Sequence, residues 1–107
     1  MVAIVTDESI DALTLRPGRE VYALVQASSV IFTTERLPFV SARNALWGVI
    51  DAVRTGAVND EISMRLDAGP RVTATLTRSS VHDLGLGPGR RACALIKASS
   101  VILAVPA

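Results

Sequence analysis

The chain has 107 residues, half of them hydrophobic, and its 11 basic and 10 acidic side chains leave a formal charge of +1. Four aromatic residues and a nearly balanced charge argue against a general nucleic-acid binder, which needs a basic surface and stacking platforms. The only cysteine, Cys93, can form neither an internal disulfide nor a metal cluster, and no apolar stretch reaches the ~18 residues of a membrane helix. These features predict a reduced, cytoplasmic protein.

The first third of the chain is predicted to hold strand segments and one short helix. Val2–Val5 is interpreted as the remnant of a strand, and a short helix follows Thr6. Pro17-Gly18 fits a type II turn, in which proline fixes φ and glycine accepts a positive φ. The apolar run Val21–Val25 is predicted to continue as a strand through Val30–Phe32.

The remainder of the chain reads as five strands with a helix between the third and the fourth. Thr33–Val40 is expected to be an extended connector that lies against the barrels. Glu61–Leu66 alternates apolar and polar residues, as a half-buried strand does, and Asp67–Pro70 predicts the turn of a hairpin. The five strands are predicted at Leu46–Arg54, Glu61–Leu66, Arg71–Leu76, Ala92–Lys97 and Val101–Val105.

The second helix is expected directly after Thr77. Ser80 and Asp83 have the spacing of a capping box, and Gly85 is placed to end the helix. A Pro88-Gly89 turn, matching the first one, then leads into the next strand.

The chain repeats itself at a constant offset of 71 residues. Residues 5–32 align with residues 76–103 without a gap, and 14 of the 28 aligned positions are identical. Both copies end in the same cluster, Ala27-Ser28-Ser29-Val30 and Ala98-Ser99-Ser100-Val101. A repeat defines the structural unit, so the chain holds one complete unit of about 70 residues and the second half of another.

The predicted fold is therefore mainly all-β: an OB-like five-stranded barrel with one short helix, in tandem with an incomplete first copy. The domains are expected at residues 1–34 (second half of a first unit), 35–40 (connector) and 41–107 (complete unit). Half a barrel cannot close alone, so either another chain supplies strands or the sequence is part of a longer tandem protein. We favour the second alternative.

Three segments of the complete unit carry donors and no carboxylate: Ser41-Ala42-Arg43-Asn44, Thr77 and Lys97-Ala98-Ser99-Ser100. Hydroxyls, two cations and backbone N–H groups left accessible by small side chains suit an anion. The alternative interpretation is structural, with Ala-Ser-Ser as a β-bulge at a barrel corner and the cations as surface residues. Neither a carboxylate pair, a Ser-His pairing nor a metal-ligand spacing occurs, and His82 is the only histidine, so no enzyme is predicted.

Several motifs together resemble the Mop (molbindin, TOBE-type) molybdate-binding domain. The resemblance covers residues 41–105, and residues 2–32 resemble the second half of another such domain. The matching motifs are Ser41-Ala42-Arg43-Asn44-x-Leu46-x-Gly48, Gly56-Ala57-Val58-Asn59, Leu84-Gly85-Leu86 and Ile96-Lys97-Ala98-Ser99-Ser100-Val101.

The resemblance implies molybdate or tungstate binding for storage or homeostasis, without catalysis or a cofactor, at interfaces within a trimer or hexamer. It implies oxyanion contacts at Ser41, Ala42, Arg43, Asn44, Thr77, Lys97, Ala98, Ser99 and Ser100. In the first copy it leaves Thr6, Gln26, Ala27, Ser28 and Ser29 as further contacts. Gln26 replaces Lys97 there, so that copy lacks one cation.

Two other functions stay open at this point. The chain could be the ligand-sensing part of a molybdate-responsive transcription regulator or of a molybdate importer ATPase subunit. An OB-like nucleic-acid-binding module is the alternative of a different class.

Overall fold

Strands dominate the computed structural model, which describes residues 3, 5, 7–37 and 39–106. The first half of the chain forms α1 (Asp7–Ala12), β1 (Tyr22–Leu24), the 3-10 turn η1 (Ala27–Ser29) and β2 (Ile31–Thr33). The second half forms β3 (Asn44–Thr55), β4 (Asn59–Leu66), β5 (Arg71–Thr77), α2 (Arg78–Leu84), β6 (Arg91–Ile96), the 3-10 turn η2 (Ala98–Ser100) and β7 (Ile102–Ala104). The order β3-β4-β5-α2-β6-β7 is the OB-like order that the sequence predicts.

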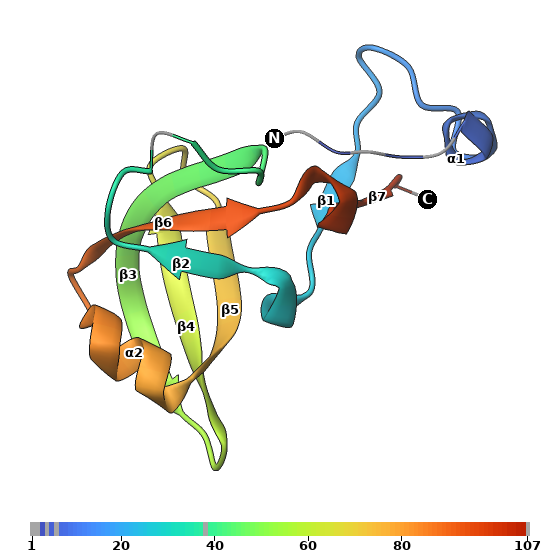
Figure 1. Ribbon diagram of the computed structural model, residues 1–107. Helices are drawn as coiled ribbons and strands as arrows, with labels where there is room; N and C mark the ends of the chain where they lie inside the picture. The colour runs from blue at the N-terminus through green and yellow to red at the C-terminus, as the bar shows by residue number, and fades with distance from the viewer. Residues whose placement is uncertain (1–2, 4, 6, 38, 107) are drawn as a thin grey trace.

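Five strands curl into an open half-barrel in the order β2-β6-β3-β4-β5, while β1 and β7 form a separate two-stranded sheet. Figure 1 shows the long strand β3 bending around the half-barrel and the β1–β7 pair standing beside its open side. The bend of β3 coincides with a register shift between Ile50 and Ala52. An extra residue of this kind bends a strand and increases its twist.

The strand that closes onto β6 comes from the first copy of the repeat. Ile31 of β2 pairs with Leu95 of β6, and Ile102 of β7 pairs with Leu24 of β1. The two pairs are equivalent under the repeat, because Ile102 corresponds to Ile31 (102 − 71 = 31) and Leu95 corresponds to Leu24 (95 − 71 = 24). The two copies have therefore exchanged their last strands reciprocally and in the same register. The domain boundaries predicted from the repeat stay a prediction. The strand pairs β2–β6 and β1–β7 each join residues from both predicted units.

The core fills the half-barrel with aliphatic side chains. Ile50, Ile62, Met64, Ala74 and Ile96 are almost completely buried. Every residue from Ala92 to Ile96 is buried because β6 lies between β2 and β3 and both of its faces are covered. Its outer face, Cys93 and Leu95, lines a cavity together with Leu37 and Val40 of the connector, so the connector lies against the barrel as expected.

The local turn predictions are confirmed at four places. Gly18 and Gly89 have φ of 87° and 88°, with Arg19 N and Arg90 N bonded to the carbonyls of Arg16 and Gly87, as type II turns require. Gly85 ends α2 in the left-handed conformation, with φ 63°. The β4–β5 hairpin turns at Gly69, whose N–H bonds to the Leu66 carbonyl.

Two other predictions and one alternative interpretation are wrong. The first copy does not run as one strand from Val21 to Phe32, because η1 separates β1 from β2. Ser80 is not the cap of α2: the N-cap is Thr77, whose side chain accepts a hydrogen bond from Ser80 N. The Ala-Ser-Ser clusters form 3-10 turns, not bulges.

The predicted strand remnant Val2–Val5 falls mostly on Val2 and Ile4, which lie outside the described residues. Its described members, Ala3 and Val5, belong to no strand.

Candidate functional site: a cationic corner between two strand ends

Two of the three donor segments meet at one corner of the half-barrel. Asn44 is the first residue of β3 and pairs with Ile96, the last residue of β6. Its side chain is buried, and Nδ2 donates a hydrogen bond of 3.2 Å to the Ile96 carbonyl oxygen. The segment Ser41–Arg43, which precedes Asn44, therefore lies beside Lys97, which follows Ile96. Asn44 and Ile96 are 52 residues apart along the chain.

The segment after β6 folds into the tight turn η2. Ser100 N bonds to the Lys97 carbonyl at 2.9 Å and Val101 N to the Ala98 carbonyl at 3.4 Å. Ala98 and Val101 are buried and anchor the turn, while Lys97 and Ser99 are exposed. The N–H groups at the start of such a turn are not used by its own hydrogen bonds, so those of Ala98 and Ser99 remain for another acceptor.

The charged side chains of the two corner segments are all positive. Arg43 and Lys97 are exposed, and neither forms an ion pair with any residue that the structure describes. Three other arginines are paired: Arg71 with Asp51 at 2.8 Å, Arg78 with Asp60 at 3.5 Å and Arg91 with Asp67 at 2.8 Å. No carboxylate belongs to Ser41–Asn44 or to Lys97–Ser100. The corner thus presents two cations without an acidic partner among the described residues, together with several hydroxyl and amide donors, and such a set of groups suits an anion.

The first copy builds the same turn without the cation. Ser29 N bonds to the Gln26 carbonyl at 2.9 Å and Val30 N to the Ala27 carbonyl at 3.5 Å, as in η2. This turn, η1, packs against β5 of the complete unit. Gln26 and Ser28 are exposed, so the segment offers neutral donors only. Thr6, the remaining residue predicted for this copy, lies outside the described residues.

Thr77 is not brought to the corner within one chain. It pairs with Asn59 at the start of β4, and Thr55 at the far end of β3 pairs with the neighbouring Asp60. Eleven residues of β3 separate Thr55 from Asn44 (55 − 44 = 11), or roughly 35 Å along the strand. The Thr77 hydroxyl instead caps α2 and donates to Ser80 Oγ at 2.8 Å.

A buried carboxylate beside Thr77 was missed by the sequence interpretation. Asp60 is 4 % exposed and pairs with the Arg78 guanidinium, although its Oδ1 makes no well-aligned hydrogen bond within the described chain. Arg78 also donates to the Gly56 carbonyl, which ties the β3–β4 turn to the start of α2. The Gly56–Asn59 motif was visible in the sequence, but its contact with Arg78 depends on a pairing 22 residues away.

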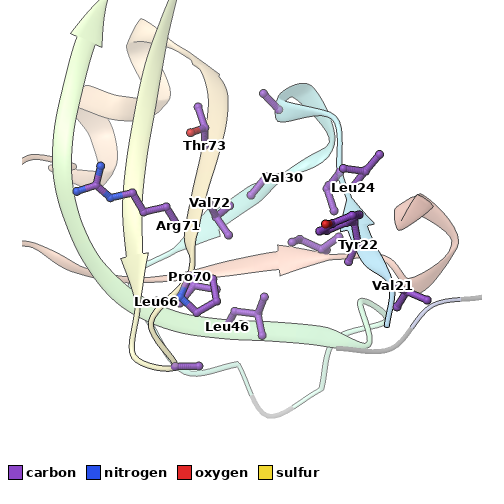
Figure 2. Close-up of a pocket in the computed structure, with 15 residues that line it drawn as sticks. Val21, Tyr22, Leu24, Val30, Leu46, Leu66, Pro70, Arg71, Val72 and Thr73 are labelled. Carbon is purple, nitrogen blue, oxygen red and sulfur yellow. The ribbon is translucent and has the colours of Figure 1, made fainter. Parts of the chain in front are cut away.

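Another cavity differs from the corner because most of its lining is apolar. It encloses about 760 Å³ at the open side of the half-barrel and is lined mainly by apolar side chains of both copies. Figure 2 shows Val21 and, from β1, Tyr22 and Leu24 on one side of it, facing Leu46, Pro70 and Val72 on the other. Its few polar side chains, among them Arg71 and Thr73, would replace only part of the hydration of an oxyanion, so the corner suits an anion better.

Metal and thiol chemistry find no support in the part of the chain that the structure describes. No three His, Cys, Asp or Glu side chains gather there as a metal site would need. Cys93 is a buried free thiol, and its burial raises its pKa, so the thiolate is disfavoured. Among the same residues, no helix has the length and apolar character to span a membrane.

Comparison with known proteins agrees with this geometry. Residues 40–103, more than half of the chain, match the TOBE domain. The chain is 47 % identical to the molybdenum transport protein ModE of Azotobacter vinelandii, over 98 % of this chain and 39 % of that protein. It is 43 % identical to the molybdenum-pterin-binding protein MopA of Rhodobacter capsulatus, over 99 % of this chain and 40 % of that protein. It therefore spans about two fifths of the length of these relatives.

Among solved structures, the chain is similar to the cytoplasmic molybdate-binding protein ModG, whose crystal structure contains bound molybdate. The TM-score is 0.92 at 46 % sequence identity, over 97 % of this chain and 74 % of ModG. The strand order, the motifs at the corner and these similarities lead to one assignment: this chain belongs to the TOBE domain family.

Proposed function

We propose that this chain binds molybdate or tungstate, without catalysis, and serves in molybdenum storage or homeostasis. The observation that carries the proposal is the carboxylate-free corner where Arg43 and Lys97 flank the Asn44–Ile96 clamp with no acidic partner among the described residues. The ModG neighbour, with molybdate bound and described as cytoplasmic, supports both the ligand and the location.

In this proposal the corner residues have two roles. Ser41, Arg43, Lys97, Ser99 and Ser100 provide hydroxyl and cationic donors, and Ala42 and Ala98 keep the backbone N–H groups accessible. Asn44 holds the two segments together through the Ile96 carbonyl, so its main contribution is to position the donors. Gln26–Ser29 and Thr6 of the first copy would form a second, weaker corner because Gln26 carries no charge.

We further propose that the site is shared between copies in a trimer or hexamer. Thr77 and the corner lie at opposite ends of β3, so a single chain cannot bring them to one ion. A second copy can place its own Thr77 end against the corner. A tetrahedral dianion needs donors all around it to replace its water shell, and two barrels can surround it.

The replacement Lys97→Gln tests the site directly. It copies the residue at the equivalent position of the first copy, and we expect it to weaken molybdate binding by ~1.5–3 kcal/mol, the usual contribution of a hydrogen bond to a charged group. Titration calorimetry with molybdate, tungstate and sulfate measures the loss and the selectivity.

The matched control is Arg90→Gln, which removes one exposed positive charge from the turn before β6, at the end of that strand away from the corner. It should leave the affinity unchanged. Equal affinity of Lys97→Gln and the unmodified protein would contradict the site. Binding of DNA or RNA that falls steeply with salt, with no response to molybdate, would favour the nucleic-acid alternative.

A second candidate function uses the same site within a larger protein. Similarity to the ModE proteins and to the molybdenum import ATP-binding protein ModC of Rhodospirillum rubrum, 37 % identical over 94 % of this chain, favours a ligand-sensing part of a regulator or importer. Storage and ligand sensing both require that the site binds the oxyanion. They differ in whether the bound ion is only held or also regulates another part of the protein.

A further inference from the structure

The end of the half-barrel that carries Thr77 holds a buried carboxylate in an otherwise apolar row. Every second residue of β4 is buried, and apart from Asp60 these residues are apolar: Ile62, Met64 and Leu66. The Asp60 side chain is 5 % exposed, and its Oδ1 lies 3.5 Å from Nε of Arg78, the residue that follows Thr77. Asp60 therefore interrupts the apolar pattern of β4 directly beside a residue of the candidate site.

This ion pair is a poor way to stabilise the barrel. Removing a carboxylate from water costs free energy, which a single partner returns only with good geometry and further hydrogen bonds. Asp60 Oδ1 makes no well-aligned hydrogen bond within the described chain, and the Arg78 side chain is 55 % exposed. An apolar side chain at position 60 would serve the core as well or better. The pair is better explained by the geometry that it imposes.

The Arg78 guanidinium connects three elements at this end of the half-barrel. It belongs to α2, pairs with Asp60 of β4 and donates a hydrogen bond to the Gly56 carbonyl in the β3–β4 turn. Figure 1 shows α2 and this turn at the same end of the half-barrel. Thr77 joins β5 to α2 and pairs with Asn59 of β4. The first turn of α2, and Thr77 with it, is therefore held against β4 and the β3–β4 turn.

The Thr77 hydroxyl needs such a fixed position if it is to contact an anion. Thr77 is exposed, its Oγ1 accepts a hydrogen bond from Ser80 N, and it lies 2.8 Å from Ser80 Oγ. Its single proton can be directed to Ser80 or to an oxyanion. Because a hydrogen bond weakens steeply when it is misaligned, a shift of α2 relative to β4 would weaken the contact with the anion.

We infer that Asp60 and Arg78 are positioning residues of the oxyanion site. They hold the Thr77 hydroxyl where the corner of a second copy can use it, and because their charges cancel, they add no net charge to the site. The inference rests on the proposed function, in which Thr77 of one copy meets Arg43 and Lys97 of another.

Replacing both partners at once tests this role. Asp60→Leu/Arg78→Gln leaves the net charge unchanged and continues the apolar pattern of β4. We expect titration calorimetry to show molybdate affinity about fivefold lower, the change that corresponds to one neutral hydrogen bond of ~1 kcal/mol. The urea midpoint should stay the same or rise. A pair with a purely structural role would lower the midpoint and leave the affinity unchanged, and that result would overturn the inference.

Asp67→Asn/Arg91→Gln is the matched control, because it removes another ion pair, at 2.8 Å, without changing the net charge. This pair joins the β4–β5 turn to β6, at the end of β4 opposite Asp60. The control should lower the urea midpoint and leave the affinity unchanged. An equal loss of affinity in the control would count against a specific role of Asp60 and Arg78.

Combined variants show whether the pair acts through Thr77. In a Thr77→Val background, Asp60→Leu/Arg78→Gln should cause no further loss of affinity, because the positioned hydroxyl is absent. In a Lys97→Gln background it should still cause the full loss. A full loss in the Thr77→Val background would overturn the inference.

Arg78→Lys keeps the charge and tests the same geometry if the double variant does not fold. It should also weaken binding, because an ammonium lacks the rigid fork with which Arg78 reaches Asp60 and the Gly56 carbonyl together. Full affinity of Arg78→Lys overturns the inference. If Lys97→Gln weakens binding and the Asp60 and Arg78 variants do not, only this inference fails. If Lys97→Gln has no effect, the proposed site itself fails.

Discussion

Asp67 and Arg91 show how single residues fasten the barrel. The Arg91 guanidinium donates two parallel hydrogen bonds to the Asp67 carboxylate, at 2.9 and 2.8 Å, and lies 5.7 Å from the centre of the Trp47 ring. Asp67 N also bonds to the Trp47 carbonyl. The β4–β5 turn, β3 and β6 are joined at this point, and the bidentate geometry orients the pair.

The Asp67–Arg91 pair predicts an acid dependence of stability. The hydrogen bonds from Arg91 lower the pKa of Asp67 below its ordinary value of 3.8. The unfolded chain then binds more protons in acid, so the stabilisation is present above 3.8 and is lost as the pH falls through the lowered folded-state pKa. Urea unfolding of the protein and of Asp67→Asn should differ at neutral pH and converge in strong acid.

Because both side chains are more than half exposed, added salt should reduce this difference. If the difference in stability between the protein and Asp67→Asn grew as the pH fell, the pKa of Asp67 would not be lowered in the folded state.

At the residue scale, the structure brings two of the three predicted donor segments together at the corner, and their part in anion binding stays a prediction. The donor-rich segments were recognisable from composition alone, because hydroxyls and cations without carboxylates suit an anion. That Asn44 clamps Ile96, and that Thr77 lies far from the corner, depends on strand pairing between residues distant in sequence.

At the scale of elements, the ends of α2 follow from local chemistry. Thr77 caps the helix, and Gly85 ends it with φ 63°. The bonds from Gly85 N to the His82 carbonyl and from Leu86 N to the Val81 carbonyl close the last turn. Since Val81 and Leu86 are both buried, this turn fixes α2 against the barrel.

Gly85→Ala should destabilise the protein by about 1–2 kcal/mol, the cost of the left-handed conformation for a residue with a Cβ. Chemical denaturation measures this change. Gly87→Ala is the matched control: neither added Cβ would meet an atom within 4 Å, but Gly87 does not have a positive φ. Equal stability of the two variants would show that the conformation at Gly85 is not the cause.

Another glycine has a steric role. A Cβ on Gly48 would collide with the backbone carbonyl of Arg65, where β3 crosses β4 closely. The Leu46-x-Gly48 spacing in the sequence marked this position without revealing the reason.

At the scale of the whole molecule, the exchange of β2 and β7 makes the two copies of the repeat mutually dependent. Each last strand completes the sheet of the other copy. Val30 and Val101, which follow the two 3-10 turns, are both buried in the same core cluster. The two corners are therefore held in a fixed relation by the core.

Mixing two variants tests whether the anion site is shared between chains. Thr77→Val and Lys97→Gln should each weaken molybdate binding at every site of their own oligomer. If one ion contacts Thr77 of one copy and Lys97 of another, mixed oligomers refolded together contain some sites with both original residues. Calorimetry of the mixture should then show that a fraction of the sites binds molybdate as tightly as the unmodified protein does. Purely weak binding in the mixture would contradict a shared site.

The sequence by itself determined the repeat, the strand and helix order, the Pro-Gly turns and the donor-rich segments. These depend on side-chain chemistry and backbone preferences within a few residues. Only the tertiary structure decided which last strand pairs with which sheet. Ile31-Phe32 and Ile102-Leu103 are nearly the same local sequence, so their strand preferences are nearly equal and cannot select a partner. Packing of the whole chain selects the partner, and in the described chain β2 pairs with β6 and β7 with β1.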